Sequence, residues 1–324
     1  MNEKTESSTT PDPAQRRSTG AAAAELIVAV DIGGTQVKYG LITAQGTMLD
    51  SGRIDTRGPD GVEQILARVD TLITGFADQC PVGIAISTFG IVDRDRGCIL
   101  AAADAIRGYV GFELKSHFER QFRLPATVEN DVNCVALAEG WRGAAIGLRN
   151  YLAITLGTGI GGGIVIDGQL YRGSGAAAGE WGYALIEGQV WEDVASLRGL
   201  AILADRAMPG RARSAQQVFE TADAGDPDAA AVLERWFSRL AIGIANLIYA
   251  FNPEAIVVGG GICARGPRFQ RELAQALDQC LRPDFRSMTR IMIAATGNQA
   301  GMLGATRNWL RVHRSESNTD GHKR

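Results

Sequence analysis

The sequence is poor in the residue types that most often build disulfides and metal centres. It has three histidines and five cysteines, and the cysteines never occur as a C-x-x-C pair. An odd number of scattered cysteines predicts neither a disulfide framework nor a cysteine zinc site, and free thiols fit a reducing cytosol. We therefore expect a cytoplasmic protein with little scope for chemistry based on histidine or zinc.

Long apolar runs and a strong excess of one charge are also lacking. The longest apolar stretch, residues 240–251, is too short to span a bilayer. The formal net charge of −3 gives no electrostatic footprint for nucleic acid. Residues 1–24 are rich in Ser, Thr, Pro and Ala, and residues 315–324 are similar, so we predict two disordered tails and no signal sequence. We expect neither a membrane nor a nucleic acid as a partner.

Glycine, in contrast, is abundant, with 40 residues, which indicates many backbone positions with positive φ or close approach to a ligand. The hydrophobic pattern predicts three strands and then alternating helices and strands from residue 25, and a second such series from residue 151. Each series opens with a hairpin around a glycine-rich turn, so we expect an α/β fold of two similar units. The helices expected span residues 61–79, 113–122, a stretch from about 133, 192–207, 215–221, 228–251, 268–281 and 300–312.

The first of these turns, D-I-G-G-T-Q-V-K, combines a carboxylate with exposed backbone N–H groups. Asp31 ends a buried strand, and the glycines that follow allow phosphate oxygens to come close. Asp31 is also placed to hold a hydrated Mg²⁺ beside those phosphates. The alternative is a plain hairpin turn with a capping aspartate. The candidate nucleotide-binding residues of this motif are Asp31, Gly33, Gly34, Thr35 and Lys38.

The second glycine turn, G-T-G-I-G-G-G, contains a G-x-G-x-x-G match at Gly157, Gly159 and Gly162. A dinucleotide-binding fingerprint requires a helix after the glycines, but residues 163–167 have the pattern of a strand. We therefore reject that interpretation and predict a second phosphate-binding hairpin, which includes Thr158, facing the first across a cleft. A Walker A loop is excluded because the sequence has no Gly-Lys pair.

A third motif, V-E-N-D-V-N, places Asn130 and Asp131 at the end of a predicted strand. Ligands of α/β proteins usually bind where strand ends gather. The alternative role for Asp131 is to cap the helix that follows.

A fourth motif, G-E-W-G-Y followed by W-E, brings carboxylates and aromatic rings together in the sequence. Glu180 and Glu192 are able to accept hydrogen bonds from sugar hydroxyls, and aromatic rings offer flat apolar faces. Trp181 and Trp191 are therefore candidates for an aromatic wall beside a sugar, together with Tyr183. The alternative is a packed aromatic loop in which both indoles face the core.

The fifth motif is a glycine run, Gly259, Gly260 and Gly261, at the end of a predicted buried strand. It leaves room for an adenine ring or a ribose, although glycines at such junctions often serve packing alone.

In this order, the five motifs closely resemble those of the ROK (repressor, open reading frame, kinase) sugar-kinase family, a branch of the actin-like ATPase superfamily, over about residues 26–312. The resemblance implies two ribonuclease-H-like domains with a cleft between them. We expect an N-terminal domain at 25–132 on the sugar and phosphate side, a nucleotide-side domain at 133–299, and a helix at 300–313 packing back on the first domain.

The resemblance also implies roles for individual residues. Asp131 matches the catalytic base and Asn130 a neighbouring sugar contact, while Gly90 lies in a segment near the sugar. Glu180 and Glu192 match sugar-contacting carboxylates. The two glycine hairpins match the phosphate loops, and residues 259–261 match the adenosine motif.

Two departures from the family pattern refine this expectation. Many members have a histidine and then a cysteine-rich zinc motif where this chain has Tyr183 and no cysteine between Cys134 and Cys263. We therefore predict no structural zinc and a resemblance to the β-glucoside kinase branch. Family repressors also carry a DNA-binding segment before the first motif, and here only 30 residues precede Asp31.

These inferences predict an ATP-dependent sugar kinase that uses Mg²⁺, with Asp131 as general base toward a sugar hydroxyl, in particular the 6-hydroxyl. The partners expected are the sugar, ATP and a second copy of the chain in a homodimer. The alternative is a non-catalytic sugar sensor on the same fold. The sugar, its anomer and the use of polyphosphate in place of ATP are left open by the residues.

Overall fold

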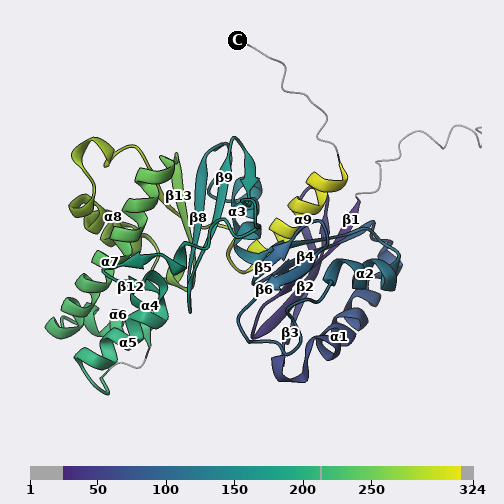
Figure 1. Cartoon of the computed structure of the whole chain (residues 1–324), viewed down its shortest axis with the longest axis horizontal. Coiled ribbons are helices and arrows are strands. Elements are labelled where there is room, and N and C mark those ends of the chain that lie inside the picture. Colours follow the sequence, from purple (N-terminus) through teal and green to yellow (C-terminus); the bar gives the residue numbers. More distant parts are fainter. Residues whose placement is uncertain (1–24, 212–213, 315–324) are drawn as a thin grey trace, which may run out of the picture.

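The computed structural model describes residues 25–211 and 214–314, which form two lobes joined side by side (Figure 1). Both predicted tails lie outside the described residues. No helix in the described chain is both long and apolar enough to cross a bilayer.

The N-terminal lobe is built on a five-stranded sheet of order β3-β2-β1-β4-β7. β1 pairs antiparallel with β2 and parallel with β4, whose residues are all buried. The strands are β1 (Leu26–Ile32), β2 (Gln36–Thr43), β3 (Met48–Asp55), β4 (Gly83–Thr88) and β7 (Ala126–Asn130), with a small hairpin of β5 (Ile91–Asp93) and β6 (Cys98–Ala101). The helices are α1 (Val62–Thr74) and α2 (Leu114–Phe122), with 3-10 turns η2 (Gly58–Asp60) and η3 (Ala77–Gln79).

The C-terminal lobe repeats the arrangement, with the order β10-β9-β8-β13-β14. Its strands are β8 (Tyr151–Leu156), β9 (Ile160–Ile166), β10 (Gln169–Tyr171), β13 (Ala255–Gly260) and β14 (Arg290–Ile293), with β11 (Leu185–Ile186) and β12 (Gln189–Val190) as a separate pair. Its helices are α4 (Trp191–Ala195), α5 (Leu197–Ala207), α6 (Ala215–Asp223), α7 (Pro227–Phe251) and α8 (Pro267–Cys280), with 3-10 turns η4 (Trp181–Tyr183), η5 (Gly261–Arg265), η6 (Pro283–Phe285) and η7 (Gly297–Gln299). The two sheets confirm the predicted α/β class and its duplication.

Helices α3 (Asp131–Arg142) and α9 (Ala300–His313) pack against each other between the two sheets. A Cβ at Gly304 would lie on the carbonyl group of Cys134, so only glycine allows this close crossing. α9 also packs on β1 and β4, and α3 packs on β8 and β9. The last helix of the chain thus returns to the first lobe, as Figure 1 shows.

Each lobe has its own hydrophobic core, built from its sheet and covering helices. The largest departure from the predicted elements is at residues 192–207, where the single helix expected is wrong. The chain forms α4 and α5 instead, because the hydroxyl of Ser196 accepts a hydrogen bond from the Gly199 N–H and starts a new helix. The pairs β5–β6 and β11–β12 were not expected from the sequence.

Candidate active site

A cleft of about 560 Å³ lies between the lobes, at the carboxyl ends of β7 and β8. Its lining comes from both lobes, which brings together most of the residues singled out from the sequence. The predicted site residues that line it are Gly90, Asn130, Asp131, Gly157, Thr158, Gly159, Glu180, Tyr183, Glu192 and Gly260.

Asp131 stands where β7 passes into α3. Asn130, and not Asp131, is the N-cap of this helix, because its Oδ1 accepts from the backbone N–H groups of Val132 (2.9 Å) and Asn133 (3.0 Å). Asp131 Oδ1 accepts from Asn130 Nδ2 at 3.1 Å and from the Val132 N–H at 2.9 Å. Within the described chain Oδ2 receives no hydrogen bond, so this carboxylate is held at one oxygen and open to a ligand at the other.

The electrostatic surroundings of Asp131 bring the pKa of its carboxyl close to neutral pH. Burial raises the pKa of this carboxyl to about 7, and the negative charges of Asp31 and Glu180 act in the same direction, against the lowering effect of the Val132 N–H. A group whose pKa lies near the working pH is the most efficient in general acid–base catalysis.

Asp31 lies at the end of β1, outside the lining of the cleft. Ser87 Oγ donates to its Oδ1 at 2.7 Å, and Lys38 Nζ lies 3.6 Å from its Oδ2. A Cβ at Gly301 would be 2.5 Å from the Asp31 carboxyl carbon, so the first turn of α9 approaches it closely. Lys38 therefore neutralises Asp31 here rather than facing the cleft.

The first glycine hairpin also lies outside the cleft lining. Gly33 donates its N–H to the Gln36 carbonyl at 3.0 Å, and Thr56 Oγ1 donates to the Gly33 carbonyl at 2.6 Å. The Thr35 carbonyl accepts from the Thr56 N–H at 2.8 Å, and Gly34 lies beside Ala105. In this arrangement the turn is packed within its own lobe, and its role as a phosphate loop stays a prediction.

The second hairpin faces the cleft. A Cβ at Gly157 would meet nothing within 4 Å, whereas one at Gly159 would lie 2.5 Å from Glu192 Oε2. The same Glu192 oxygen accepts from the Ile160 N–H at 3.3 Å. Burial raises the pKa of Glu180, as does the charge of Glu192. Open backbone and two carboxylates thus occupy the side of the cleft opposite Asp131.

The glycine run at the end of β13 connects the cleft with a second hollow of about 580 Å³. Gly260 lines the cleft and Gly261 lines the hollow, together with Leu197, Phe219 and Arg265. Gly260 has φ 88°, and a Cβ there would lie 2.4 Å from the Leu156 carbonyl oxygen, so the turn requires glycine. Gly259 lies inside the strand and lines neither space.

The aromatic wall expected from the two indoles is wrong. Trp191 is fully buried, and its Nε1 donates to the Arg239 carbonyl at 3.1 Å. Trp181 packs edge-on against Phe251 and onto the core of the lobe. Tyr183 alone of these aromatics lines the cleft, and 66% of it is exposed.

The opposite wall comes partly from the segment around Gly90, which the family resemblance placed near the sugar, and partly from residues that sequence reasoning missed. Phe89 lines the cleft and stacks on Tyr109 with ring centroids 5.2 Å apart. Residues 101–103, which were missed, also line the cleft; they start at the last residue of β6 in the unexpected β5–β6 hairpin. The turn composition of residues 93–97 between two apolar segments was the signal for this hairpin.

Among the described residues no group of three His, Cys, Asp or Glu side chains is placed to hold a metal ion. A single carboxylate with phosphate oxygens and water is, however, a usual Mg²⁺ environment. The role of Asp31 in such a site stays a prediction.

Comparison with known proteins shows what this arrangement resembles. Residues 27–311 match the ROK family. The chain is 34% identical over 299 residues to a "Beta-glucoside kinase" of Klebsiella pneumoniae, covering 89% of this chain and 97% of the relative. It is 33% identical over 326 residues to a "Glucokinase" of Halalkalibacterium halodurans, covering 91% and 98%. The crystal structure of a ROK family glucokinase from Streptomyces griseus, in complex with glucose and AMPPNP, superposes with a TM-score of 0.74 at 28% identity, covering 87% of this chain and 98% of that one.

Proposed function

The chain belongs to the ROK family, and on this basis we propose that it is an ATP-dependent kinase that phosphorylates a sugar hydroxyl. The observation that supports this most directly is Asp131, a carboxylate with its pKa raised to about 7 in a cleft that also contains an open glycine hairpin. The two named relatives and the glucokinase structure support the same class of reaction.

In the proposed reaction Asp131 accepts the proton of a sugar hydroxyl, in particular the 6-hydroxyl of a hexose or β-glucoside. The oxygen forms a bond to the γ-phosphorus of ATP as the bond from that phosphorus to the β–γ bridging oxygen breaks, and ADP leaves. The free Oδ2 of Asp131 is the atom suited to take the proton, because Oδ1 is already occupied by Asn130 and Val132. Such transfer depends mainly on positioning and on charge stabilisation.

The other cleft residues have complementary roles in this proposal. Glu180 accepts hydrogen bonds from sugar hydroxyls, and Glu192 does so while holding the second hairpin through the Ile160 N–H. The N–H groups of Gly157, Thr158 and Gly159 donate to phosphate oxygens. Residues 33–35 reach the same phosphates only if the lobes close. Asp31 would hold Mg²⁺ through water, and the ion would offset the charge of the phosphates.

The hollow beyond Gly261 is the proposed place for the adenosine part of ATP. It is lined by apolar side chains such as Leu197 and Phe219 beside the polar head of Arg265, a composition typical of sites for small organic ligands. Its junction with the cleft at Gly260 would allow the phosphates to extend toward Asp131.

A nucleotide turnover assay with a panel of sugars tests the proposal. The panel contains glucose, mannose, N-acetylmannosamine, fructose, allose and the β-glucoside cellobiose, each with ATP and Mg²⁺. We expect ADP release that depends on at least one of these sugars. Sugar binding without any turnover would instead support the non-catalytic sensor.

A further inference from the structure

A buried carboxylate lies just before the turn that carries Asp131. Glu129, the residue before Asn130 in β7, is only 2% exposed. Its Oε1 accepts from the Asn130 backbone N–H at 3.1 Å and from Asn133 Nδ2 at 2.9 Å. Asn130 in turn caps α3 and donates to Asp131 Oδ1. One oxygen of Glu129 therefore contacts residues on both sides of Asp131 and holds the turn between them.

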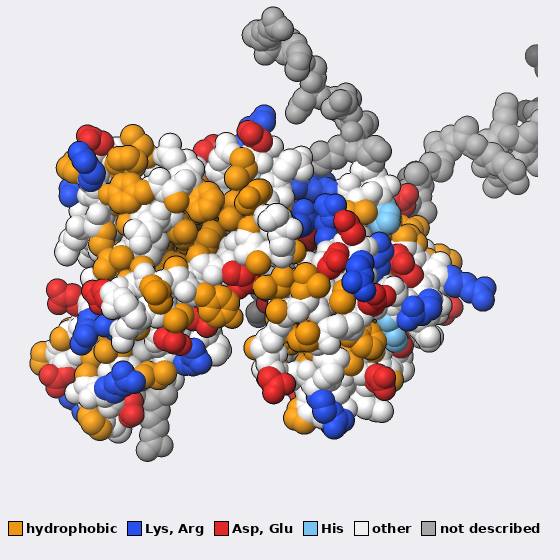
Figure 2. Space-filling view, viewed as in Figure 1, with side chains coloured by type: hydrophobic (Ala, Val, Ile, Leu, Met, Phe, Trp, Pro, Cys, Tyr) orange, Lys and Arg blue, Asp and Glu red, His pale blue; other side chains and the backbone are white. Residues whose placement is uncertain are grey.

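The cation that pairs with Glu129 comes from the other lobe. Arg172, directly after β10, donates from Nε to Glu129 Oε2 at 2.7 Å, and its NH2 group lies 2.7 Å from the same oxygen. The two side chains are 20% and 3% exposed, and Figure 2 shows Lys and Arg side chains gathered where the two lobes meet. Burying a carboxylate costs a large free energy unless a cation pairs with it. Glu129 of the first lobe therefore depends on Arg172 of the second.

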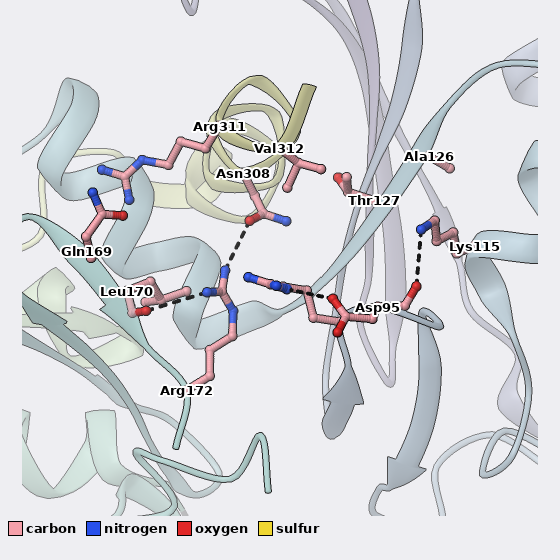
Figure 3. A pocket seen from close by; sticks show the side chains of 11 residues that line it. Asp95, Lys115, Ala126, Thr127, Gln169, Leu170, Arg172, Asn308, Arg311 and Val312 are labelled. Carbon is pink, nitrogen blue, oxygen red and sulfur yellow. Dashed lines mark hydrogen bonds and ion pairs between the residues drawn. The ribbon is translucent and has the colours of Figure 1, made fainter. Parts of the chain in front are cut away.

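Arg172 is itself held in place from α9. Its NH2 group donates to Asn308 Oδ1 at 3.2 Å, and Asn308 is 2% exposed. Figure 3 shows the Arg172 guanidinium directed toward Asn308. A guanidinium presents its N–H groups in a rigid planar fork, so contacts to β7 and α9 together fix its orientation. The Glu129 carboxylate is oriented in turn, with Oε1 toward Asn130 and Asn133.

We propose that Arg172 is a positioning residue of the candidate kinase and acts on Asp131 through Glu129, across the boundary between the lobes. The inference rests on the proposed function, in which Asp131 Oδ2 takes the proton of the sugar hydroxyl. Asp131 Oδ1 is held by Asn130 and by Val132. A displacement of about 1 Å at a reacting group costs as much as 10²-fold in rate. The place of Asn130 therefore matters for the reaction, and the Arg172–Glu129 pair sets it from the opposite lobe.

The alternative role for this pair is to tie the lobes together without any effect on the turn. The hydrogen bonds at Glu129 distinguish the two roles. Both carboxylate oxygens are in use, Oε1 by Asn130 and Asn133 and Oε2 by Arg172. Glutamine has one acceptor oxygen, so Glu129→Gln cannot satisfy both sides while Arg172 is present. When Arg172 is also replaced by glutamine, the amide at position 129 accepts from Asn130 and Asn133 and donates to the amide at position 172.

Steady-state kinetics of the full chain test the proposal with four variants: Arg172→Gln, Arg172→Lys, Glu129→Gln and the double variant Arg172→Gln/Glu129→Gln. The matched control is Arg96→Gln, because Arg96 also pairs with a glutamate, Glu113 at 2.6 Å, but on the exposed surface of a single lobe. The sugar is the member of the panel that gives the highest parent rate. ATP binding at equilibrium measures the fraction of folded, competent protein, so that kcat is expressed per functional site.

Arg172→Gln and Glu129→Gln should each lower kcat by about tenfold to 100-fold. The KM for ATP should change less than about twofold, because neither residue lines the cleft or the adenosine hollow. Arg172→Lys keeps the positive charge but loses the planar fork, so it should lower kcat only about threefold. The double variant should recover to within about threefold of the parent, because a neutral pair again holds the turn. Arg96→Gln should match the parent.

The proposal is overturned if Arg172→Gln keeps more than half of the parent kcat. It is equally overturned if the double variant is as slow as the slower single variant, because the loss would then follow the contact between the lobes and not Glu129. If Arg172→Gln does not fold, Glu129→Gln and the double variant decide in the same way. A parent chain without sugar-dependent turnover would overturn the kinase proposal and this inference with it, whereas an active parent with equally active variants would overturn this inference alone.

Discussion

The two lobes have the same strand order, yet their glycine hairpins lie in different surroundings. The first turn is closed by the Gly33–Gln36 hydrogen bond and by Thr56, and it lies outside the cleft lining. The second turn faces the cleft, and a Cβ at Gly157 would meet open space. The duplicated sheet thus supplies a scaffold, and the neighbours of each hairpin decide what it presents.

The lobes also contribute different chemistry. The N-terminal lobe supplies Asp131 at the end of β7, beside Asp31. The C-terminal lobe supplies open backbone and the carboxylates of Glu180 and Glu192. We therefore assign proton transfer to the first lobe and phosphate binding chiefly to the second, and the following predictions test this division.

The largest effect is expected at Asp131. Asp131→Asn is nearly isosteric but cannot accept the proton, so kcat should fall by at least about 10²-fold while sugar and ATP still bind. Steady-state kinetics and equilibrium binding measure the two parts. Asp55→Asn, at the end of the edge strand β3, is the matched control and should keep the parent rate. A variant at Asp131 with more than half the parent kcat would remove this residue from the mechanism.

The pH dependence should follow from the same carboxyl. Because the pKa of Asp131 is raised to about 7, the active carboxylate is lost as the pH falls, and kcat/KM should drop about tenfold per pH unit below pH ~6.

The same carboxyl should make the stability of the fold depend on pH. In the unfolded chain the pKa of an aspartate is about 3.9. Between pH ~7 and pH ~3.9 the folded state therefore binds a proton that the unfolded state does not, and the free energy of unfolding rises as the pH falls. Asp131→Asn should therefore unfold at higher urea concentration than the parent at pH 8, with the difference shrinking toward pH 5. A difference independent of pH would contradict the raised pKa.

The two hairpins can be compared by matched glycine substitutions. Gly157→Ala puts a methyl group into the open space proposed for phosphates, so the KM for ATP should rise about tenfold with little loss of stability. Gly34→Ala puts a methyl group 3.3 Å from Ala105 Cβ, away from the cleft, and should raise the KM for ATP less. Equal increases would show that both hairpins hold phosphate in the closed enzyme.

Substitutions of the two carboxylates of the second lobe should raise the KM values of different substrates. Glu180→Gln should raise the KM for the sugar by roughly threefold to tenfold, the loss of one hydrogen bond to a charged group. Glu192→Gln also weakens the bond to the Ile160 N–H, so it should raise the KM for ATP as well. Initial rates with each substrate varied in turn distinguish these outcomes. An identical pattern for both variants would argue against a role of Glu192 in positioning the hairpin.

The smallest effect concerns the choice of sugar. Tyr183 is the exposed aromatic ring of the cleft, and it is the proposed contact for the second ring or aglycone of a β-glucoside. Stacking of this kind contributes about 1 kcal/mol, roughly fivefold in kcat/KM. Tyr183→Ala should therefore lower kcat/KM for cellobiose about fivefold and leave that for glucose nearly unchanged. If the parent prefers glucose by tenfold or more, the β-glucoside assignment fails and the kinase proposal stands.

The linear pattern of residues was enough to predict the fold class and half of the residues that line the candidate cleft. Alternating and helical periodicity predicted the two sheets, because one face of each element must be apolar to be buried. Glycine turns at strand ends predicted the second hairpin and the run through Gly260. The residues at the end of β7 were predicted as a site because strand ends gather at one edge of a sheet.

Other features depend on contacts between residues far apart in the chain. The indoles of Trp181 and Trp191 face the core because Phe251 and Arg239, on α7, accommodate them. Burial raises the pKa of Asp131, and the charge of Asp31, 100 residues earlier in the chain, adds to this effect. Arg172, on the segment after β10, likewise meets Glu129 of β7 and Asn308 of α9 only in the folded chain. Periodicity encodes which face of an element is buried, but only tertiary packing decides which distant charges and polar atoms come together.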